Sequence, residues 1–326
     1  MDRRDAVIAL IALGTAPLAA RAQTAGAPWR IAWISPTTIE GDRHGILEAF
    51  TSKMKDLGRV EGRDYVLLLH EFGGRMEILP ALVREVIGLH PDVIVTGGSA
   101  SVAALKKETT TIPIVFGTAG DVVEQGFVVS LARPGRNITG VTLRIDAASK
   151  VVQFIREALP AARRVAVLEH DGDLVAPRIT ASYQRAAVTQ SLGINVARVK
   201  RPEDFERAFA DIARAKAEVL LVPQETLFAR HSERISNLAF KARLPMVSQD
   251  QRRFGESALL CYGSDALENY HRVAVMVDKI LKGAKPGDLP VEEPDRFTLT
   301  LNARVARAYG ILFPQLLLAR ADRVIE

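Results

Sequence analysis

The sequence predicts an α/β protein made of two similar doubly wound lobes, each built on a parallel sheet, with a ligand cleft between them. Short apolar, β-branched runs such as 92–96 and 112–116 alternate with amphipathic helix patterns along the chain. Strands of this kind are typical of parallel sheets that helices cover on both faces. The pattern also repeats, because the runs near positions 31, 66, 93 and 112 recur 134, 130, 126 and 132 residues later. We therefore expect two lobes of the same topology, with their strand ends facing each other.

The stretch Pro91–Val122 holds the clearest part of the first lobe. An apolar strand, Asp92–Thr96, is followed by Gly97-Gly98 and by a helix that starts at Ser99. Ligands of doubly wound sheets lie where strand ends meet helix starts. The unpaired N–H groups of a helix N-terminus suit a carboxylate or another anion. Ser99 is expected to be the N-cap of this helix and not a nucleophile, because no G-x-S-x-G frame surrounds it.

The rest of the first lobe follows the same alternation of strands and helices. A strand at Ile31–Ile34 ends in a hydroxyl-rich loop. Later in the chain, Asp121 and Glu124 form a D-x-x-E capping box, which predicts a helix over 121–132. The stretch 133–142 is dense in turn residues and is predicted to be the first crossover between the lobes.

The second lobe repeats these elements and then extends them. Asp265 is expected to cap a long helix, and a last strand is expected at Arg296–Leu301. The five strands that precede these elements are expected within Arg164–Glu169, Asn195–Val199, Val219–Val222, Leu244–Asp250 and Ala258–Tyr262.

The chain is long enough for two hydrophobic cores. It has 326 residues, of which 48% are hydrophobic and 25% are charged, and chains of this size ordinarily divide into two domains. We expect the first lobe to comprise residues 29–141 plus about 265–290. The second lobe is then expected to comprise residues 142–264 plus about 295–320.

The N-terminus has the three parts of a secretory signal. Arg3-Arg4 precedes an apolar run over 6–20, and Ala20-Arg21-Ala22 provides the small residues of a cleavage site. We expect residues 1–22 to be a signal peptide that is cleaved after Ala22, which places the mature protein in an exported compartment, most simply the periplasm. The run is shorter than the roughly 20 apolar residues of a membrane span. The paired arginines leave twin-arginine and general secretory export both open.

Charge and cysteine content exclude several classes of protein. Without the signal the net charge falls from +5 to +4, and the basic residues are scattered apart from short pairs such as Arg163-Arg164 and Arg252-Arg253. This pattern is typical of a solvated surface, so we expect no nucleic-acid partner. Cys261 is the only cysteine and cannot form an intrachain disulfide. The six histidines lack the spacing of metal ligands, and we expect no metal and no cofactor.

Polar and small residues at the strand ends are the candidates for ligand binding. Each has a plain interpretation as a cap or turn residue. Together they are expected to line both walls of the cleft, and hydrogen-bonding groups without reaction machinery favour reversible binding. The candidate ligand-binding residues are Ser35, Thr37, Thr38, Gly98, Ser99, Ala100, Thr118, Asp121, Glu169, His170, Gln224, Asp250 and Tyr262.

Six segments carry a family resemblance and span nearly the whole mature chain. They are Asp56–Gly62, Pro91–Val95, Thr110–Phe116, Leu131–Val141, Ile280–Gly283 and Leu318–Asp322. As a set they resemble the solute-binding proteins of ABC transporters, in the family that includes tryptophan-binding-type members. The resemblance implies a type I periplasmic-binding-protein fold, three crossovers between the lobes and a membrane permease as partner. It leaves the ligand open, because the family varies in what it binds. Glu169-His170-Asp171 also stand where relatives often have an Asn/Pro turn, so no ligand is transferred to that wall.

Sequence and resemblance together predict an exported, monomeric solute-binding receptor that is not an enzyme. Its solute is expected to be small and polar, an amino acid or a related small carboxylate. The carboxylate is expected to meet Ser99 and the N–H groups of 98–101, and either Asp121 or Asp250 is expected to meet an amine. A ligand-sensing partner of a sensor kinase and an exported two-lobed enzyme remain as alternatives. A sugar-repressor-type regulator is disfavoured, because the N-terminus carries a signal where such proteins have a DNA-reading headpiece.

Overall fold

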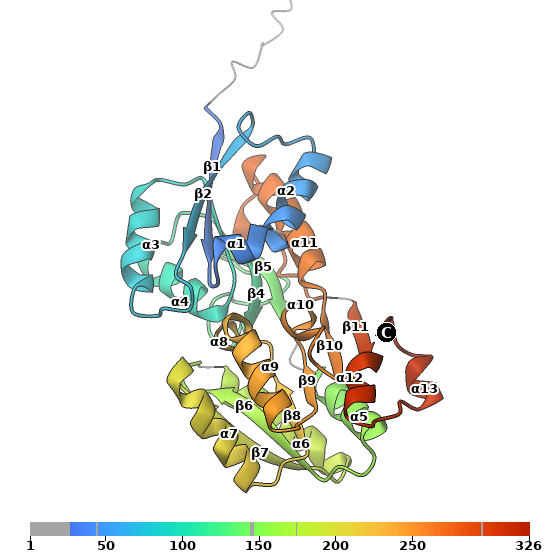
Figure 1. The fold of residues 1–326 in the computed structure, drawn as a ribbon. Helices are drawn as coiled ribbons and strands as arrows, with labels where there is room; N and C mark the ends of the chain where they lie inside the picture. Colours follow the sequence, from blue (N-terminus) through green and yellow to red (C-terminus); the bar gives the residue numbers. More distant parts are fainter. Residues whose placement is uncertain (1–26, 44, 144–146, 174, 295) are drawn as a thin grey trace, which may run out of the picture.

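The computed structural model describes residues 27–43, 45–143, 147–173, 175–294 and 296–326 (Figure 1). The predicted signal peptide, 1–22, lies outside these residues. Two lobes stand one above the other in Figure 1, each with its own sheet. Within the described residues, no helix has both the length and the apolar character that crossing a membrane requires.

The first lobe is built on five parallel strands in the order β2-β1-β3-β4-β5. This is a doubly wound order. Alternate residues of β1 point to opposite faces, so that Trp33 packs with one core and Ile34 with the other. The strands are β1 (Trp29–Ser35), β2 (Tyr65–Glu71), β3 (Val93–Thr96), β4 (Ile114–Gly120) and β5 (Ile138–Leu143).

Helices cover both faces of this sheet. One face packs against α2 and α11, whereas the other packs against α3 and α4. The helix α11 follows five strands of the second lobe in the sequence but contributes its apolar face to the core of the first lobe. The helices on this sheet are α1 (Ile39–Arg43), α2 (Ile46–Asp56), α3 (Leu79–Gly88), α4 (Ser99–Glu108) and α11 (Ala266–Leu281).

The second lobe is built on seven strands in the order β12-β11-β10-β9-β8-β6-β7. The five strands from β6 to β10 are parallel, β11 runs antiparallel to β10, and β12 is parallel to β11. The strands are β6 (Arg164–His170), β7 (Gly193–Val199), β8 (Val219–Val222), β9 (Met246–Ser248), β10 (Leu260–Ser264), β11 (Phe297–Asn302) and β12 (Arg323–Ile325).

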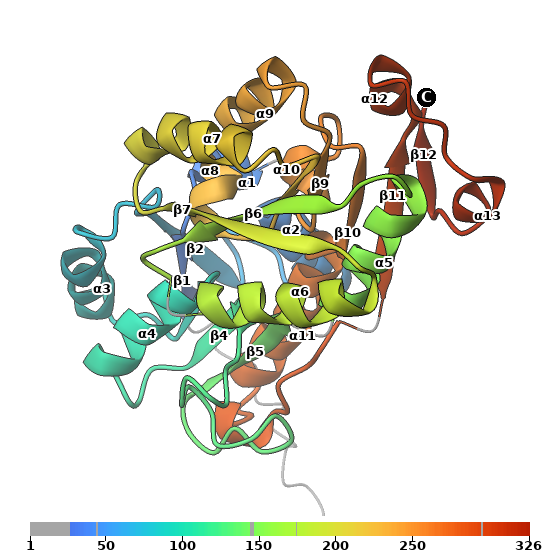
Figure 2. The same cartoon turned by 90° about the horizontal axis from the view of Figure 1, so that it is seen from below.

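The view from below shows α5 and α6 on one side of the second sheet and α7 and α9 on the other (Figure 2). The short helices α8 and α10 lie at the end of this sheet that faces the first lobe (Figure 1). The helices of this lobe are α5 (Ala148–Ala158), α6 (Ala176–Thr189), α7 (Phe205–Arg214), α8 (Thr226–Arg230), α9 (Ser232–Lys241), α10 (Gln251–Phe254), α12 (Ala303–Ala308) and α13 (Gln315–Leu318). Two short 3-10 turns lie at Pro202–Asp204 and Pro286–Asp288.

The predicted fold class is confirmed. Strands that are related by the constant offset in the sequence occupy equivalent places in the two sheets. The order β7-β6-β8-β9-β10 in the second lobe repeats the order β2-β1-β3-β4-β5 in the first lobe. The chain passes between the lobes three times, between β5 and α5, between β10 and α11, and between α11 and β11.

Two local predictions for the first lobe are wrong. The stretch 121–132 forms turns instead of a helix: Asp121 has a φ of +50°, and the N–H groups of Phe127 and Val128 both donate to the Val122 carbonyl. The crossover does not begin at 133, because Ile138–Leu143 is the fifth strand of the sheet. Gly140 suggested a turn in the sequence, but a side chain there would collide with the Phe116 backbone, so glycine lets β5 approach β4.

Candidate functional site

A cavity of about 430 Å³ lies between the two lobes. The first lobe contributes the β1–α1 loop, the start of α4 and the end of β4, and the second lobe contributes the loops after β6, β8, β9 and β10. These are the carboxyl ends of the strands, where ligands of doubly wound sheets bind. Eight predicted site residues line the cavity: Thr37, Gly98, Ser99, Ala100, Thr118, His170, Gln224 and Asp250.

The start of α4 forms one part of the first lobe's wall. Gly98 is the N-cap of α4, in place of the predicted Ser99, and has a φ of +80° that glycine adopts without strain. Its N–H donates to the Thr118 carbonyl at 2.6 Å. The N–H groups of Ser99 and Ala100 belong to the first helical turn and have no acceptor within the helix. Because α4 has ten residues, its N-terminus adds a favourable field for an anion.

The Ser99 hydroxyl is held in place by two donors. Its Oγ accepts hydrogen bonds from the Gly120 N–H at 3.3 Å and from Gln125 Nε2 at 3.2 Å. The hydroxyl proton is therefore free to turn toward an acceptor in the cavity. Gln125, which the sequence analysis missed, also lines the cavity and donates to the Gly120 carbonyl at 2.6 Å.

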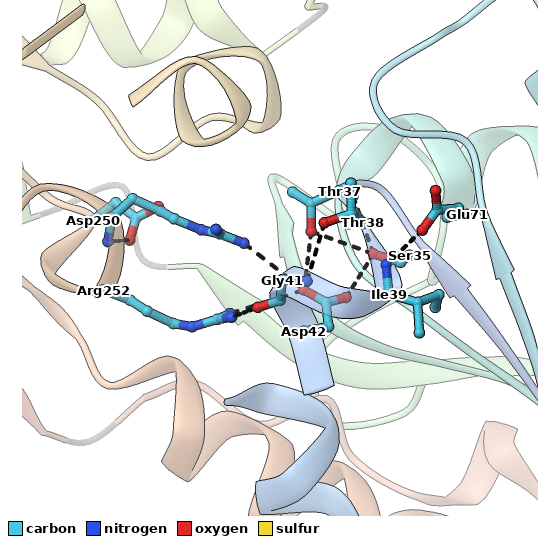
Figure 3. Close-up of polar contacts among 10 residues, drawn as sticks. Ser35, Thr37, Thr38, Ile39, Gly41, Asp42, Glu71, Asp250 and Arg252 are labelled. Atoms are coloured by element: carbon cyan, nitrogen blue, oxygen red, sulfur yellow. Dashed lines mark hydrogen bonds and ion pairs between the residues drawn. The ribbon is translucent and has the colours of Figure 1, made fainter. Parts of the chain in front are cut away.

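The β1–α1 loop is organised around a buried carboxylate that the sequence analysis missed (Figure 3). Ser35 donates to Oδ2 of Asp42 at 2.6 Å, and Thr37 donates to Oδ1 at 2.9 Å. Thr38 accepts a hydrogen bond from the Gly41 N–H at 3.0 Å. Of the three predicted hydroxyl residues, Thr37 lines the cavity, whereas Ser35 and Thr38 support the loop behind it.

His170 and Glu225 form a hydrogen-bonded pair on the second lobe's wall. Nδ1 of His170 lies 3.0 Å from Oε1 of Glu225, and the other carboxylate oxygen caps α8 by accepting the Leu227 N–H at 2.6 Å. Burial lowers the pKa of His170, the Glu225 carboxylate raises it, and the net shift is upward. Asp173 lines the same wall, and burial raises the pKa of its carboxyl group.

Asp250 lies at the start of α10. It accepts the Arg253 N–H at 3.1 Å as the N-cap of this helix. Burial raises the pKa of the Asp250 carboxyl group, which marks a site where a cationic partner is favourable. Arg252 and Arg253, which follow on the same helix, also line the cavity.

Besides Ser35 and Thr38, three predicted site residues lie away from the cavity lining. Asp121 lies 3.0 Å from Arg178 of the second lobe, without an aligned hydrogen bond to Oδ2. Glu169 is buried and accepts a hydrogen bond from Arg198 at 2.9 Å. Tyr262 packs its ring on Phe154 and Phe297, with centroid distances of 4.9 Å and 5.5 Å. Each of these groups already has a protein partner.

The remaining lining is largely apolar. Tyr270 from α11 covers Gly117, where a Cβ would lie 2.5 Å from the tyrosine ring. Tyr183 donates its hydroxyl proton to Gln249, and its fully buried ring packs in the core of the second lobe next to the lining. Other apolar lining side chains are Phe72, Leu79, Val175, Ile179 and Phe297. Across the residues that the structure describes, no three His, Cys, Asp or Glu side chains gather to hold a metal.

Comparison with known proteins gives a consistent family match. The family model for the ABC transporter substrate binding protein matches residues 32–325. A tyrosine-binding protein of Clostridioides difficile (strain R20291) is 22% identical over 263 residues, which cover 80% of this chain and 75% of that protein.

Solved structures agree with this match. A conserved domain protein of Vibrio cholerae is 25% identical, with a TM-score of 0.84, and the alignment covers 91% of this chain and 99% of that one. An ABC domain in complex with L-Trp from Streptococcus pneumonia has a TM-score of 0.85 at 17% identity, covering 92% and 100% of the two chains. The ligand-free, open structure of a substrate binding protein from Clostridium difficile has a TM-score of 0.67 at 18% identity, covering 91% and 99%.

Proposed function

Because this chain belongs to the ABC transporter substrate-binding protein family, we propose that it is an exported receptor that closes its two lobes on an amino acid or a related small carboxylate. The receptor then delivers the solute to an ABC permease in the inner membrane. We further propose that the mature protein is a monomer with no nucleic-acid partner. Its lobes comprise residues 29–141 plus about 265–290, and residues 142–264 plus about 295–320.

One observation carries this proposal: the cavity between the lobes has an anion-suited helix start on one wall and the half-buried carboxyl group of Asp250 on the other. The solute carboxylate accepts hydrogen bonds from the Ser99 and Ala100 N–H groups and from the Ser99 hydroxyl. The solute ammonium group meets Asp250. Asp121 is the weaker choice, because it lies off the cavity and already pairs with Arg178.

The apolar part of the lining supports a solute with a large apolar side chain. Ile179 and Phe297 line the cavity and are partly exposed, so they offer apolar surface to such a side chain. A cavity of about 430 Å³ lies in the range of ordinary small-molecule sites. The relatives described as binding tyrosine and L-Trp are consistent with an aromatic amino acid.

The solute is tested with mature protein from a periplasmic extract. Native mass spectrometry identifies any co-purified molecule, and calorimetry follows with L-tyrosine, L-tryptophan and their analogues without the amine or without the carboxylate. We expect the intact amino acids to bind most tightly, because each analogue lacks the group that would pair with the polar groups of one wall. Turnover of a bound solute, or equal binding of the analogue without a carboxylate, would contradict the proposal.

Export is tested separately on protein from fractionated cells. We expect cleavage after Ala22 and a mature chain that begins at Gln23, because Ala20 and Ala22 satisfy the small-residue rule of signal cleavage. N-terminal analysis of the periplasmic fraction decides this. A cytoplasmic protein that keeps Met1 would contradict both the export and the transport proposals.

A further inference from the structure

Two arginines of the second lobe, Arg252 and Arg253, reach the first lobe across the cavity. Figure 3 shows Arg252 pointing toward Gly41 and Asp42. Arg252 donates from Nη2 to the Gly41 carbonyl of α1, and its Nη1 lies 3.9 Å from Oδ1 of Asp42. Nη2 of Arg253 lies 3.9 Å from the same carboxylate oxygen. The side chains of Asp42, Arg252 and Arg253 are 1%, 26% and 24% exposed, so the contact is largely removed from solvent.

The first lobe is shaped to receive these guanidinium groups. Ser35 and Thr37 fix the Asp42 carboxylate with two hydrogen bonds, and Glu71 accepts the Ile39 N–H at 2.6 Å, which anchors the start of α1. A Cβ at Gly45 would lie 2.7 Å from Cζ of Arg252. The absence of a side chain at Gly45 therefore leaves room for the guanidinium group of Arg252.

A second contact between the lobes is weaker. Arg178 of α6 lies 3.0 Å from Asp121 and 4.0 Å from Glu124, but the Arg178 side chain is 52% exposed. Exposed ion pairs contribute little and are screened by salt. The contacts of Arg252 and Arg253 combine lower exposure with a charge-assisted hydrogen bond, which makes them the stronger link between the lobes.

We propose that Arg252 and Arg253, together with Gly41, Asp42 and Gly45, form a clasp that favours the closed arrangement of the lobes before any ligand binds. Every contact of the clasp joins protein to protein. It therefore raises the closed fraction by the same factor whatever the solute is, and apparent affinity rises with that fraction. The clasp sets how tightly the receptor binds, and the other lining residues set which solute it binds.

The α10 helix links this clasp to the cavity. Asp250 caps α10 and holds the Arg253 backbone, so that one short helix carries both the carboxyl group that faces the cavity and the two arginines of the clasp. A displacement of α10 therefore moves the Asp250 carboxyl group and the two arginines of the clasp together. The clasp itself rests only on contacts between the lobes and does not depend on the identity of the proposed solute.

Closure without ligand is measured by cross-linking. A Cβ at Gly120 of the first lobe would lie 3.6 Å from Cγ1 of Val175 in the second, so Gly120→Cys with Val175→Cys creates a pair that meets only when the lobes are closed. Cys261 is 1% exposed and does not compete. The protein is unfolded, dialysed under reducing conditions to remove bound molecules and refolded. The reductant is then removed, a small-molecule oxidant is added, and the rate of disulfide formation is followed at low salt.

The clasp predicts a slower rate in two different kinds of variant. Arg252→Gln with Arg253→Gln removes the charges, and Gly45→Ala displaces Arg252 while keeping every charge. Each is expected to lower the cross-linking rate at least roughly threefold, since the rate follows the closed fraction. Arg304→Gln is the matched control, because its pair with Glu256 lies within the second lobe. Circular dichroism and thermal melts verify folding.

The cross-linking rates of the two variants and the control decide whether the clasp exists. A reduced rate in both variants, with the control unchanged, supports the clasp. An unchanged rate in both variants, or no cross-linking of the ligand-free parent, would overturn it. Neither of these results bears on the solute, because no ligand is added.

Discussion

The wall of the first lobe offers a ligand backbone N–H groups and hydroxyls, whereas the wall of the second lobe offers ionisable side chains. On the first wall, the N–H groups of Ser99 and Ala100 are fixed by helix geometry, and the carboxylate of Asp42 is already engaged by two hydroxyl groups. On the second wall, His170, Asp173, Glu225 and Asp250 are held by caps and neighbours but face the cavity. We propose from this difference that the first lobe anchors a feature common to many solutes and that the second selects among them.

The largest expected effect comes from placing a charge on the anchoring wall. Ser99→Asp keeps an oxygen that accepts from Gly120 and Gln125, so the fold is preserved. A second carboxylate about 4 Å from the solute carboxylate costs roughly 3–4 kcal/mol at an effective dielectric constant of about 20. Calorimetry with L-tyrosine and L-tryptophan is expected to show a loss of affinity of more than a hundredfold.

The control for this variant is Gln184→Glu, which adds the same charge on an exposed position of α6. Its affinity is expected to match the parent protein. Ser99 is the better position than Gly98, because the φ of +80° at Gly98 would add backbone strain to any larger side chain. If Ser99→Asp binds like the parent, the carboxylate is held elsewhere.

A smaller effect is expected on the selecting wall. Asp250→Asn keeps an oxygen that accepts the Arg253 N–H, so α10 stays capped, but it removes the charge that meets the solute ammonium group. The expected loss is about 2–3 kcal/mol for an amino acid, the range for a hydrogen bond to a charged group. The analogue without an amine should bind both proteins equally. Calorimetry on the two proteins with each of the two ligands measures the coupling energy between Asp250 and the solute amine. If Asp250→Asn weakens the binding of both ligands equally, Asp250 does not contact the ammonium group.

The sequence predicted the fold because the evidence for it is local and repeated. Buried parallel strands require short apolar β-branched runs, and two lobes of one topology require those runs twice. The helix starts at the strand ends follow from the same geometry, which is why Gly98, Ser99 and Asp250 were found as cavity residues. Asp121 and Glu169 were included on the same basis, but arginines distant in the sequence pair with them.

The contacts between the lobes could not be predicted in this way. Arg252-Arg253 resembled a solvated basic pair, and Asp42 follows a loop without any distinguishing pattern. They meet because two lobes come together, across 211 residues of sequence for Arg252 and Gly41. The residue pattern within either segment gives no sign of a contact between positions so far apart in the sequence. Gly45 could not be assigned a role from the sequence for the same reason, because the group that a side chain there would meet is a guanidinium group of the other lobe.

The smallest effect concerns the pH dependence of the selecting wall. The net upward shift in the pKa of His170 means that its protonated form is stabilised in the folded protein by Glu225. This contribution is fully present below the unfolded pKa of about 6.5. It is lost as the pH rises through the higher folded value. The thermal stability of the parent protein should therefore fall relative to that of His170→Gln as the pH is raised from about 5.5 to 8.

The comparison with His170→Gln reports on His170 together with its electrostatic neighbour Asp173, because His170 lowers the pKa of that carboxyl group. The carboxyl groups of Asp173 and Asp250 also have raised pKa values, but they are present in both proteins. Melting curves at several pH values give the difference, which is expected to be about 1 kcal/mol or less, since the side chains of the pair are partly open to solvent. A difference in stability that stays constant across this pH range would mean that Glu225 caps α8 without stabilising the protonated form of His170.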